Sequence, residues 1–385
     1  AVIELKNLYK SYRGKSVLMN ISLTIQDNEF FVLIGSSGCG KTTLLKTLNK
    51  LNPIDKGEIL INGTPINRIK VTQLPRLMGY VVQEGGLFPH MTVEDNIALA
   101  MRVAGYPKEK IYDRITELLE LVNLEPDQYR SQYPSQLSGG QRQRIGVARA
   151  FAADPEIILM DEPFSALDPM TRAELQDEVH RLQLRFHKTI VFVTHDMDEA
   201  VKLADRICIL QNGHVVQCDK PENILKHPAN EYINSFIGKN RLWENPSFIR
   251  AEDIMRPRPI TISQSRTVVQ AVQLMRHYNI DSLLVTGDDN KFAGMVWLQD
   301  LIGIDQYSSP VSSFLSDDYL SVRVDDSLST VLEKVADYGE KDFGILPVLD
   351  AEGAIRGFLN RSSLLSTLSR RFIDEPVERD EQEGA

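Results

Sequence analysis

The sequence has few cysteines and no long apolar run. Its three cysteines, Cys39, Cys208 and Cys218, are too few and odd in number to form a disulfide framework. Such cysteine usage suits a reducing cytosol. The longest apolar runs are about the length of a β-strand, far short of the ~20 residues that span a bilayer. The chain does not open on a charged-then-apolar leader, so we expect no secretion signal.

An excess of basic charge is also lacking. The formal net charge is −10, which argues against nucleic acid as a partner. Half of this excess lies in residues 374–385, where six acidic side chains accompany one arginine, Arg379. We therefore expect residues 373–385 to be a disordered acidic tail. The overall composition, 42% hydrophobic and 25% charged, is that of an ordinary soluble protein.

The stretch Gly35 to Thr42 reads GSSGCGKT and fits the phosphate-loop pattern. An apolar segment of strand length, 30–34, precedes it, and residues 42–48 can continue as a helix. The glycines allow successive backbone N–H groups to point into one concavity, where the helix N-terminus adds positive potential. We expect Lys41 to reach the terminal phosphates of ATP and Thr42 to bind Mg²⁺. The predicted nucleotide-binding residues here are Gly35, Ser36, Ser37, Gly38, Cys39, Gly40, Lys41, Thr42 and Thr43.

Polar residues follow three further apolar segments that read as strands. Gln83 ends the segment from Met78, two carboxylates (Asp161 and Glu162) end the segment from Glu156, and His195 follows the segment 189–194. Strands that alternate with helices and end in polar residues predict an α/β fold with a parallel sheet. We expect a site at the carboxyl ends of its strands.

Together, these stretches resemble the ATPase subunit of ATP-binding-cassette (ABC) transporters over residues 1–240. The phosphate loop, Gln83, the LSGGQ signature, the Asp161-Glu162 pair, the SALD loop (Ser165 to Asp168) and His195 occur in family order. The signature pentapeptide is specific to this family. Its residues, expected to contact nucleotide, are Leu137, Ser138, Gly139, Gly140 and Gln141.

The resemblance implies a role for each residue in the attack of water on the γ-phosphate of ATP. Asp161, Thr42 and Gln83 would hold Mg²⁺, and Glu162 would act as general base. His195 would contact the γ-phosphate and the water, which places Glu162, His195 and Gln83 in the catalytic group. Tyr12, which from the sequence alone reads as edge-strand packing, would stack on adenine.

Partners follow from the same resemblance. In this family two cassettes pair head to tail, so that the signature of one chain faces the ATP on the phosphate loop of the other, with Asp168 at the junction. A chain with one set of motifs would therefore form a homodimer. The segment after Gln83, including Leu87 and Phe88, would meet transmembrane permease subunits, although both side chains could instead be core residues.

The C-terminal third contains an internal repeat. Asp253-Ile254-Met255 matches 313–315, and after a short insertion Leu283 matches Leu346. Each copy reads as strand, helix, two strands and helix, and the pair resembles tandem cystathionine-β-synthase (CBS) domains. We expect an ATP-binding cassette with a mixed sheet and helical subdomain, followed by a βαββα pair. The expected boundaries are a cassette at 1–240, a linker at 241–250, CBS domain 1 at 251–308 and CBS domain 2 at 309–372.

The nucleotide motif of CBS pairs, Gly-x-x-Thr/Ser-x-x-Asp, is poorly matched. Trp297 replaces the hydroxyl residue after Gly294, and Asn360 follows Gly357. The pair could be a dimerising module, a sensor of ionic strength, or a site for a two-fold symmetric ligand such as cyclic di-AMP. For the last of these, Tyr338 or Phe343 could stack on adenine and Arg356 could meet phosphate.

A cassette followed by a CBS pair is the arrangement of osmoprotectant importers for glycine betaine, carnitine or choline. We therefore expect a motor subunit on the cytoplasmic face of the cell membrane, held by permease subunits that receive solute from an extracellular binding protein or domain. The alternatives are an importer of another small solute, a soluble cassette regulator or DNA-maintenance protein, and an idle binding module. Intact Glu162 and His195 weigh against the idle module.

Overall fold

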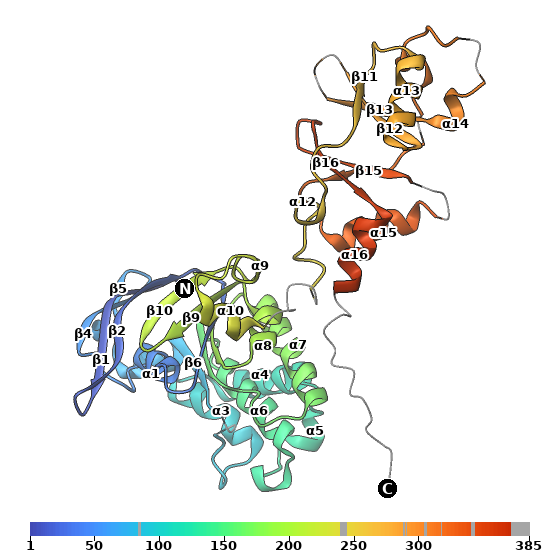
Figure 1. Ribbon diagram of the computed structural model, residues 1–385. Helices are drawn as coiled ribbons and strands as arrows, with labels where there is room; N and C mark the ends of the chain where they lie inside the picture. Colours follow the sequence, from blue (N-terminus) through green and yellow to red (C-terminus); the bar gives the residue numbers. More distant parts are fainter. Residues whose placement is uncertain are drawn as a thin grey trace, which may run out of the picture. The chain divides into compact units, whose positions relative to one another are not determined.

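The computed structural model describes residues 1–83, 86–238, 245–287, 289, 291–303, 306–316, 318–339 and 343–370. The predicted acidic tail, residues 373–385, and residues 241–244 of the predicted linker lie outside this description. The chain divides into two compact units, Ala1–Ile237 and Gly238–Ala385 (Figure 1). Each unit has its own sheets and its own hydrophobic core.

The first unit opens with an antiparallel sheet of strand order β2-β1-β4-β5. Apolar side chains of β1, including Ile3, Leu5 and Leu8, are buried between more exposed neighbours, as the alternation in the sequence predicts. The strands β4 and β5 form a hairpin with Asn62 and Gly63 in its turn. The strands are β1 (Ile3–Tyr12), β2 (Lys15–Ile25), β4 (Lys56–Ile61) and β5 (Thr64–Pro65).

The second sheet of this unit has the order β10-β9-β3-β8-β7-β6 and is parallel except for β10. Its central strands are buried on both faces, which explains their continuous apolar sequences. The strands are β3 (Phe30–Gly35), β6 (Met78–Val81), β7 (Ile157–Asp161), β8 (Thr189–Thr194), β9 (Arg206–Gln211) and β10 (His214–Asp219).

The register of this sheet brings the predicted site residues to one edge. Ile34 of β3 pairs with Thr194 of β8, and Val193 of β8 pairs with Asp161 of β7. The phosphate loop, Glu162 and His195 all follow directly after these strand ends. The predicted parallel sheet, with its polar residues gathered at the carboxyl ends, is confirmed.

Helices cover the central sheet, and α1 packs between it and the first sheet in a single core. The helix α6, which carries the signature, lies so close to β6 that a Cβ atom on Gly79 would be 2.1 Å from the carbonyl oxygen of Ala150. The α-helices are α1 (Lys41–Leu48), α2 (Leu74–Leu77), α3 (Val93–Val103), α4 (Lys108–Leu121), α5 (Pro126–Tyr129), α6 (Gly139–Phe151), α7 (Pro169–Phe186), α8 (Met197–Leu203), α9 (Pro221–Lys226) and α10 (Glu231–Ile237). Short 3₁₀ turns are η1 (Ile66–Arg68), η2 (Val71–Gln73) and η3 (Pro134–Gln136).

The second unit contains the predicted repeat of strand, helix, two strands and helix. The two three-stranded sheets have the matching orders β11-β12-β13 and β14-β15-β16. The first copy is β11 (Thr261–Ser263), α13 (Val268–Tyr278), β12 (Ser282–Thr286), β13 (Phe292–Trp297) and α14 (Leu298–Leu301). The second copy is β14 (Val322–Arg323), α15 (Leu328–Asp337), β15 (Ile345–Leu349), β16 (Ile355–Asn360) and α16 (Arg361–Arg370). The helix α12 (Ala251–Ile254) precedes the first copy, and η4 (Val311–Phe314) lies between the two.

Candidate functional site

The phosphate loop is shaped to receive an anion. Gly38 and Gly40 have φ angles of +77° and +110°, which glycine adopts without the strain that a Cβ atom would cause. Lys41 is buried, and its Nζ donates to the carbonyl oxygens of Gly35 at 2.8 Å and Ser36 at 3.1 Å. A buried ammonium beside a curved loop that opens α1 fits a phosphate chain.

Close packing holds this loop in place. A Cβ atom on Gly40 would lie 2.9 Å from the carbonyl oxygen of Val17, so the start of β2 presses against the loop. Cys39 is buried within the loop, and burial raises the pKa of its thiol. Cys39 is therefore a small packing residue rather than an activated nucleophile.

The predicted metal ligands Thr42 and Asp161 are in contact. The Oγ1 atom of Thr42 donates to Oδ1 of Asp161 at 2.8 Å, at the junction of α1 and β7. A hydroxyl, one carboxylate and substrate phosphates are oxygen ligands of the kind that Mg²⁺ takes. Tyr80 on β6 donates to the other carboxylate oxygen of Asp161 at 3.4 Å, and burial and the Asp161 charge raise the pKa of Tyr80. The sequence did not indicate Tyr80, because nothing in an apolar strand marks which neighbour its tyrosine faces.

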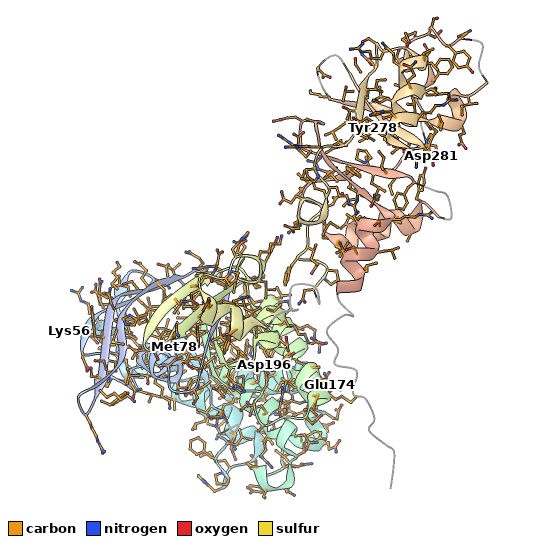
Figure 2. The ribbon with its side chains drawn as sticks, in the orientation of Figure 1. Lys56, Met78, Glu174, Asp196, Tyr278 and Asp281 are labelled. Atoms are coloured by element: carbon orange, nitrogen blue, oxygen red, sulfur yellow. The ribbon has the colours of Figure 1, made fainter. Side chains whose placement is uncertain are left out.

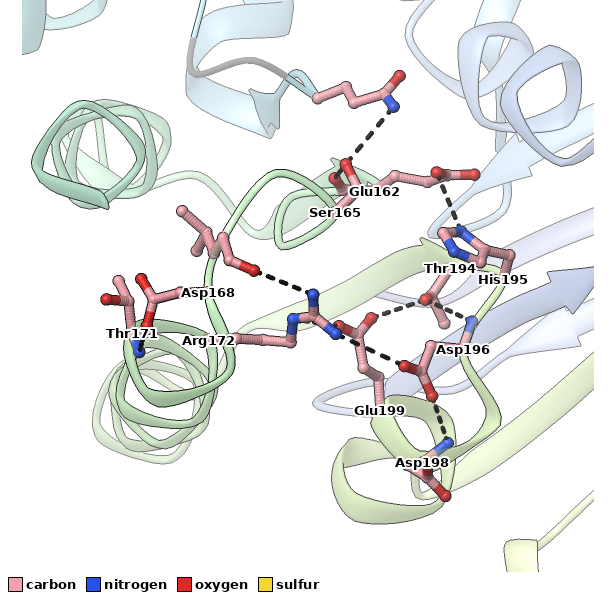
Figure 3. A network of polar contacts seen from close by, with 12 residues as sticks. Glu162, Ser165, Asp168, Thr171, Arg172, Thr194, His195, Asp196, Asp198 and Glu199 are labelled. Carbon is pink, nitrogen blue, oxygen red and sulfur yellow. Dashed lines mark hydrogen bonds and ion pairs between the residues drawn. The ribbon is translucent and has the colours of Figure 1, made fainter. Parts of the chain in front are cut away.

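Glu162 and His195 face each other across the ends of β7 and β8 (Figure 3). His195 Nδ1 lies 3.2 Å from Glu162 Oε2. Glu162 has a φ of +44°, a left-handed conformation that is costly for a residue with a Cβ atom. Its backbone N–H donates to the carbonyl oxygen of Val193 at 3.0 Å, which holds the turn. This turn directs the carboxylate of Glu162 away from the strand and toward His195.

Gln83 also reaches this edge of the sheet. Its Nε2 donates to Oγ of Ser165 at 3.5 Å, and Ser165 donates to the carbonyl oxygen of Glu162 at 3.1 Å. Gln83 is thereby linked to the chain segment that carries the two carboxylates. The described contacts bring Gln83, Glu162 and His195 together, and Thr42 and Asp161 lie at the same strand ends.

The signature and the SALD loop share a separate cavity of about 560 Å³. Ser138 caps α6 by accepting from the backbone N–H of Gln141 at 3.2 Å. Asp168 caps α7 by accepting from the N–H of Thr171 at 3.0 Å, and this bond lowers the pKa of Asp168. The residues that line the cavity are Ser138, Gly139, Gly140, Gln141, Arg144, Ala166, Leu167, Asp168 and Thr171. Of the residues that the structure describes there, none belongs to the phosphate loop.

Leu137 and Tyr12 occupy contrasting environments. Leu137, the first signature residue, is buried and anchors the segment before α6. Tyr12 is exposed at the end of β1, in the hairpin that continues into Val17, and Lys10 Nζ lies 5.1 Å from its ring centroid. Val17, farther along this hairpin, packs against the phosphate loop at Gly40, and an exposed ring such as that of Tyr12 is a surface on which a base could stack.

A buried ion pair joins the two helices that carry the signature and the SALD loop. Arg144 on α6 binds the fully buried Glu178 and, at 2.8 Å, the half-exposed Glu174, both on α7. Glu174 is labelled in Figure 2. Burial raises the pKa of Glu178, and the charge of Arg144 opposes this shift.

We expect Arg144→Met to lower the free energy of unfolding by about 3–5 kcal/mol, because it leaves the Glu178 carboxylate buried without its cation. Glu174→Gln, which removes only the exposed partner, should cost less than ~1 kcal/mol. Urea denaturation of both variants measures the difference. If both variants lost equally little free energy of unfolding, the assignment of Arg144 and Glu178 as a buried ion pair would be contradicted.

Described residues of the second unit line a cavity of about 700 Å³ and another of about 600 Å³, and the two linings share Asp281 and Trp297. The predicted ligand residues are not gathered in either one. Tyr338 lines the larger cavity and donates to Asp318 at 3.0 Å. Phe343, which the sequence offers as a ring that could stack on adenine, has 5% of its surface exposed and belongs to the core of the second repeat. Arg356 is paired with Asp350 at 2.9 Å and is absent from the described lining of both cavities.

No helix in the described parts of the chain is both long and apolar enough to cross a membrane.

Comparison with known proteins agrees with this geometry. Residues 18–165 match the ABC transporter family, and residues 251–305 and 311–370 match the CBS domain. The chain is 44% identical over 367 residues to the choline transport ATP-binding protein OpuBA of Bacillus subtilis, which covers 94% of this chain and 95% of the relative. It is also 44% identical to the glycine betaine/carnitine/choline transport ATP-binding protein OpuCA of Bacillus subtilis, over 94% of this chain and 95% of the relative.

The likeness extends to more distant relatives and to solved structures. The osmoprotectant import ATP-binding protein OsmV of Salmonella typhimurium is 36% identical, with 96% of both chains covered. A dimeric ATP-binding cassette in a post-hydrolysis state with ADP and Pi superposes with a TM-score of 0.53 and 33% identity, over 57% of this chain and 98% of that one. The chain therefore belongs to the family of ABC transporter ATP-binding proteins that includes these choline and glycine betaine/carnitine/choline transport subunits.

Proposed function

We propose that this chain is the ATP-hydrolysing subunit of a membrane importer for quaternary-amine compatible solutes. The observation that carries the proposal is the edge of the central sheet, where the phosphate loop, Asp161, Glu162 and His195 converge. Phosphoryl transfer to water needs a phosphate cradle, a metal-binding oxygen pair and a group that accepts a proton from water. All three lie at this edge.

Each residue has a distinct task in the proposed reaction. Lys41 and the loop N–H groups bind the β- and γ-phosphates of ATP. Glu162 accepts the proton of the attacking water, and His195 holds the Glu162 carboxylate and donates toward the γ-phosphate. When bound to Thr42, Asp161 and Gln83, Mg²⁺ would neutralise charge that develops on the phosphate oxygens. Tyr12 stacks on the adenine.

The separate signature cavity supports a homodimer with shared sites. Ser138 and Gly140 lie at the N-terminus of α6, where free N–H groups favour an anion. The described lining of this cavity contains no phosphate-loop residue. A phosphate bound there would therefore belong to ATP held by the phosphate loop of a second chain. The dimeric arrangement in the superposable cassette structure is consistent with this proposal.

An apolar groove beside Phe88 supports docking of a permease subunit. Its volume is about 530 Å³, and its lining includes Leu51, Val71, Phe88 and Val103, all exposed large apolar residues. Asn96 fixes the loop at Phe88 through bonds to both its N–H and its carbonyl oxygen. Of the two interpretations of Phe88, as core or as contact residue, its exposure favours contact.

We expect Val71→Asp to weaken capture of the permease at least ~10-fold, since charge in an apolar contact typically costs more than 1.4 kcal/mol. Val71 is 71% exposed, so folding should be unaffected. Leu184→Asp, at an exposed apolar residue of α7, is the matched control. Co-purification from membranes that contain the permease gives the measurement. Undiminished capture by Val71→Asp, or equal loss in both variants, would remove this groove from the interface.

The solute and the location are inferred from the relatives. Their names specify choline, carnitine and glycine betaine, and we propose solutes of this class for an importer whose ATPase subunit lies on the cytoplasmic face of the membrane. An importer of another small solute is the alternative. Uptake of radiolabelled choline, carnitine and glycine betaine, by cells with and without this chain, distinguishes the two.

We further propose that the CBS pair regulates transport by binding cyclic di-AMP, the alternative being a dimerising or ionic-strength-sensing module. The two large cavities and the repeated βαββα units support a ligand-binding module. A two-fold symmetric ligand would join the modules of two chains.

Calorimetry with the full-length Lys41→Ala variant, whose cassette should not bind nucleotide, is expected to give one cyclic di-AMP for two chains, with no heat from AMP. Absence of heat at several salt concentrations would contradict regulation by this ligand. Binding of AMP instead would indicate an ordinary mononucleotide site.

A further inference from the structure

Arg172, on the first turns of α7, lies between two loops that have separate roles in the proposed mechanism, the SALD loop and the loop after β8. Its Nη2 donates to the carbonyl oxygen of Leu167 at 3.0 Å, within the SALD loop that lines the signature cavity (Figure 3). The same guanidinium points to the loop after β8. There, Nη1 lies 3.8 Å from Asp196 Oδ2, and Nε lies 3.9 Å from Glu199 Oε1.

One of the two carboxylates that face Arg172, that of Glu199, is tied through Thr194 to the backbone on both sides of His195. Glu199, only 7% exposed as a side chain, accepts from Oγ1 of Thr194 at 2.6 Å. The same hydroxyl of Thr194 accepts from the backbone N–H of Asp196 at 3.0 Å. His195 is therefore held between Thr194 and Asp196, which are hydrogen-bonded to each other. The carboxylates of Asp196 and Glu199 lie within ion-pair distance of Arg172.

Arg172 brings a positive charge to this cluster of carboxylates. Burial raises the pKa of Glu199, and the hydrogen bond from Thr194 opposes this shift; the Asp196 carboxylate raises the pKa further, and the Arg172 guanidinium lowers it. A cavity of about 30 Å³, the size of one water molecule, lies among these groups and reaches Glu162 and His195. Loss of the guanidinium would leave the carboxylates of Asp196 and Glu199 in a partly buried space without this cation. Repulsion between the two like charges would then favour their separation.

We propose that Arg172 is a positioning residue that couples the SALD loop to His195. The guanidinium holds the Leu167 carbonyl on one side and the Asp196–Glu199 carboxylates on the other. A displacement of the SALD loop, which lines the signature cavity, is thereby transmitted to the ring that contacts Glu162. Arg172 does not itself touch the reacting atoms; it acts through His195.

This inference rests on the proposed ATP hydrolysis and predicts a specific kinetic pattern. Arg172→Met should lower kcat by ~10- to ~100-fold, the loss typical of a misplaced catalytic group. The KM for ATP should stay within about two-fold, because ATP is bound by the phosphate loop. Arg172→Lys, which keeps the charge without the planar fork, should recover part of kcat. Arg185→Met, on the same helix and in an exposed pair with Glu117, is the matched control and should leave kcat unchanged.

A double-mutant cycle distinguishes positioning from general stabilisation. If Arg172 acts through His195, adding Arg172→Met to His195→Ala should reduce the rate no further than about two-fold. Single-turnover release of radiolabelled phosphate measures such slow rates in the full chain. Losses that multiply in the double variant, or a rise in KM with unchanged kcat, would overturn the inference while leaving the proposed function intact. A wild-type chain that does not hydrolyse ATP would overturn both.

Discussion

Glu162→Gln is expected to lower the rate of ATP hydrolysis by ~10²–10⁴-fold, the usual contribution of a general base. An amide at this position cannot accept the proton of the attacking water. ATP binding should persist, because Lys41 and the loop glycines are unchanged and lie on a different strand end. The variant should therefore retain an affinity for ATP close to that of wild type, measured by filter binding, while phosphate release falls.

The matched control for this substitution is Glu156→Gln, on the residue that precedes the same strand, β7, at its opposite end. Its carboxylate accepts from Asn62 at 3.0 Å, which a glutamine carbonyl can also do. This variant should hydrolyse ATP at the wild-type rate. Turnover near wild type in Glu162→Gln would exclude Glu162 as the base, and loss of ATP affinity would show that its role is in binding.

Ser138→Asp is expected to reduce hydrolysis by ~10² fold or more while leaving ATP bound to the same chain's phosphate loop. Aspartate caps a helix as well as serine does, so α6 should still fold. The new carboxylate, however, would face the phosphates that the signature must receive, where removal of one stabilising donor alone typically costs ~10²–10³-fold. The rate and the ATP affinity of the purified chain provide the measurement.

Ser327→Asp provides the control, because Ser327 caps α15 in the second unit in the same way, by accepting from the N–H of Thr330 at 3.1 Å. It should have no effect on the rate. A normal rate in Ser138→Asp would show that the signature does not meet phosphate, and loss of ATP affinity in that variant would place the signature at the chain's own nucleotide.

Much of the catalytic edge could be predicted because local patterns determine it. A strand buried on both faces is continuously apolar, and in a parallel sheet the residues after such strands meet at one edge. This pattern alone predicts that Asp161, Glu162 and His195 lie at that edge. The repeats of the second unit were equally readable, since Leu283 and Leu346 occupy equivalent buried positions on β12 and β15.

Contacts between elements that are distant in sequence could not be predicted. Tyr80 reaches Asp161 because β6 lies beside β7, and Arg144 reaches Glu178 because α6 packs against α7. No local pattern specifies either register or helix orientation. The burial of Phe343 could not be predicted either. An aromatic residue near a loop suggests an exposed ring on which a ligand could stack, whereas packing in the second repeat buries this ring.

The central claim is that hydrolysis needs the phosphate loop of one chain and the signature of another. Mixing the Lys41→Ala and Ser138→Asp variants tests it most directly. Each variant is expected to be inactive alone, because every ATP site in its homodimer lacks either an intact phosphate loop or an intact signature. A mixed dimer contains one site with Lys41 and Ser138 both intact. An equimolar mixture should therefore hydrolyse ATP at roughly a quarter of the wild-type rate, since half of the dimers are mixed and each has one complete site. A mixture no more active than its separate components would contradict the shared-site mechanism.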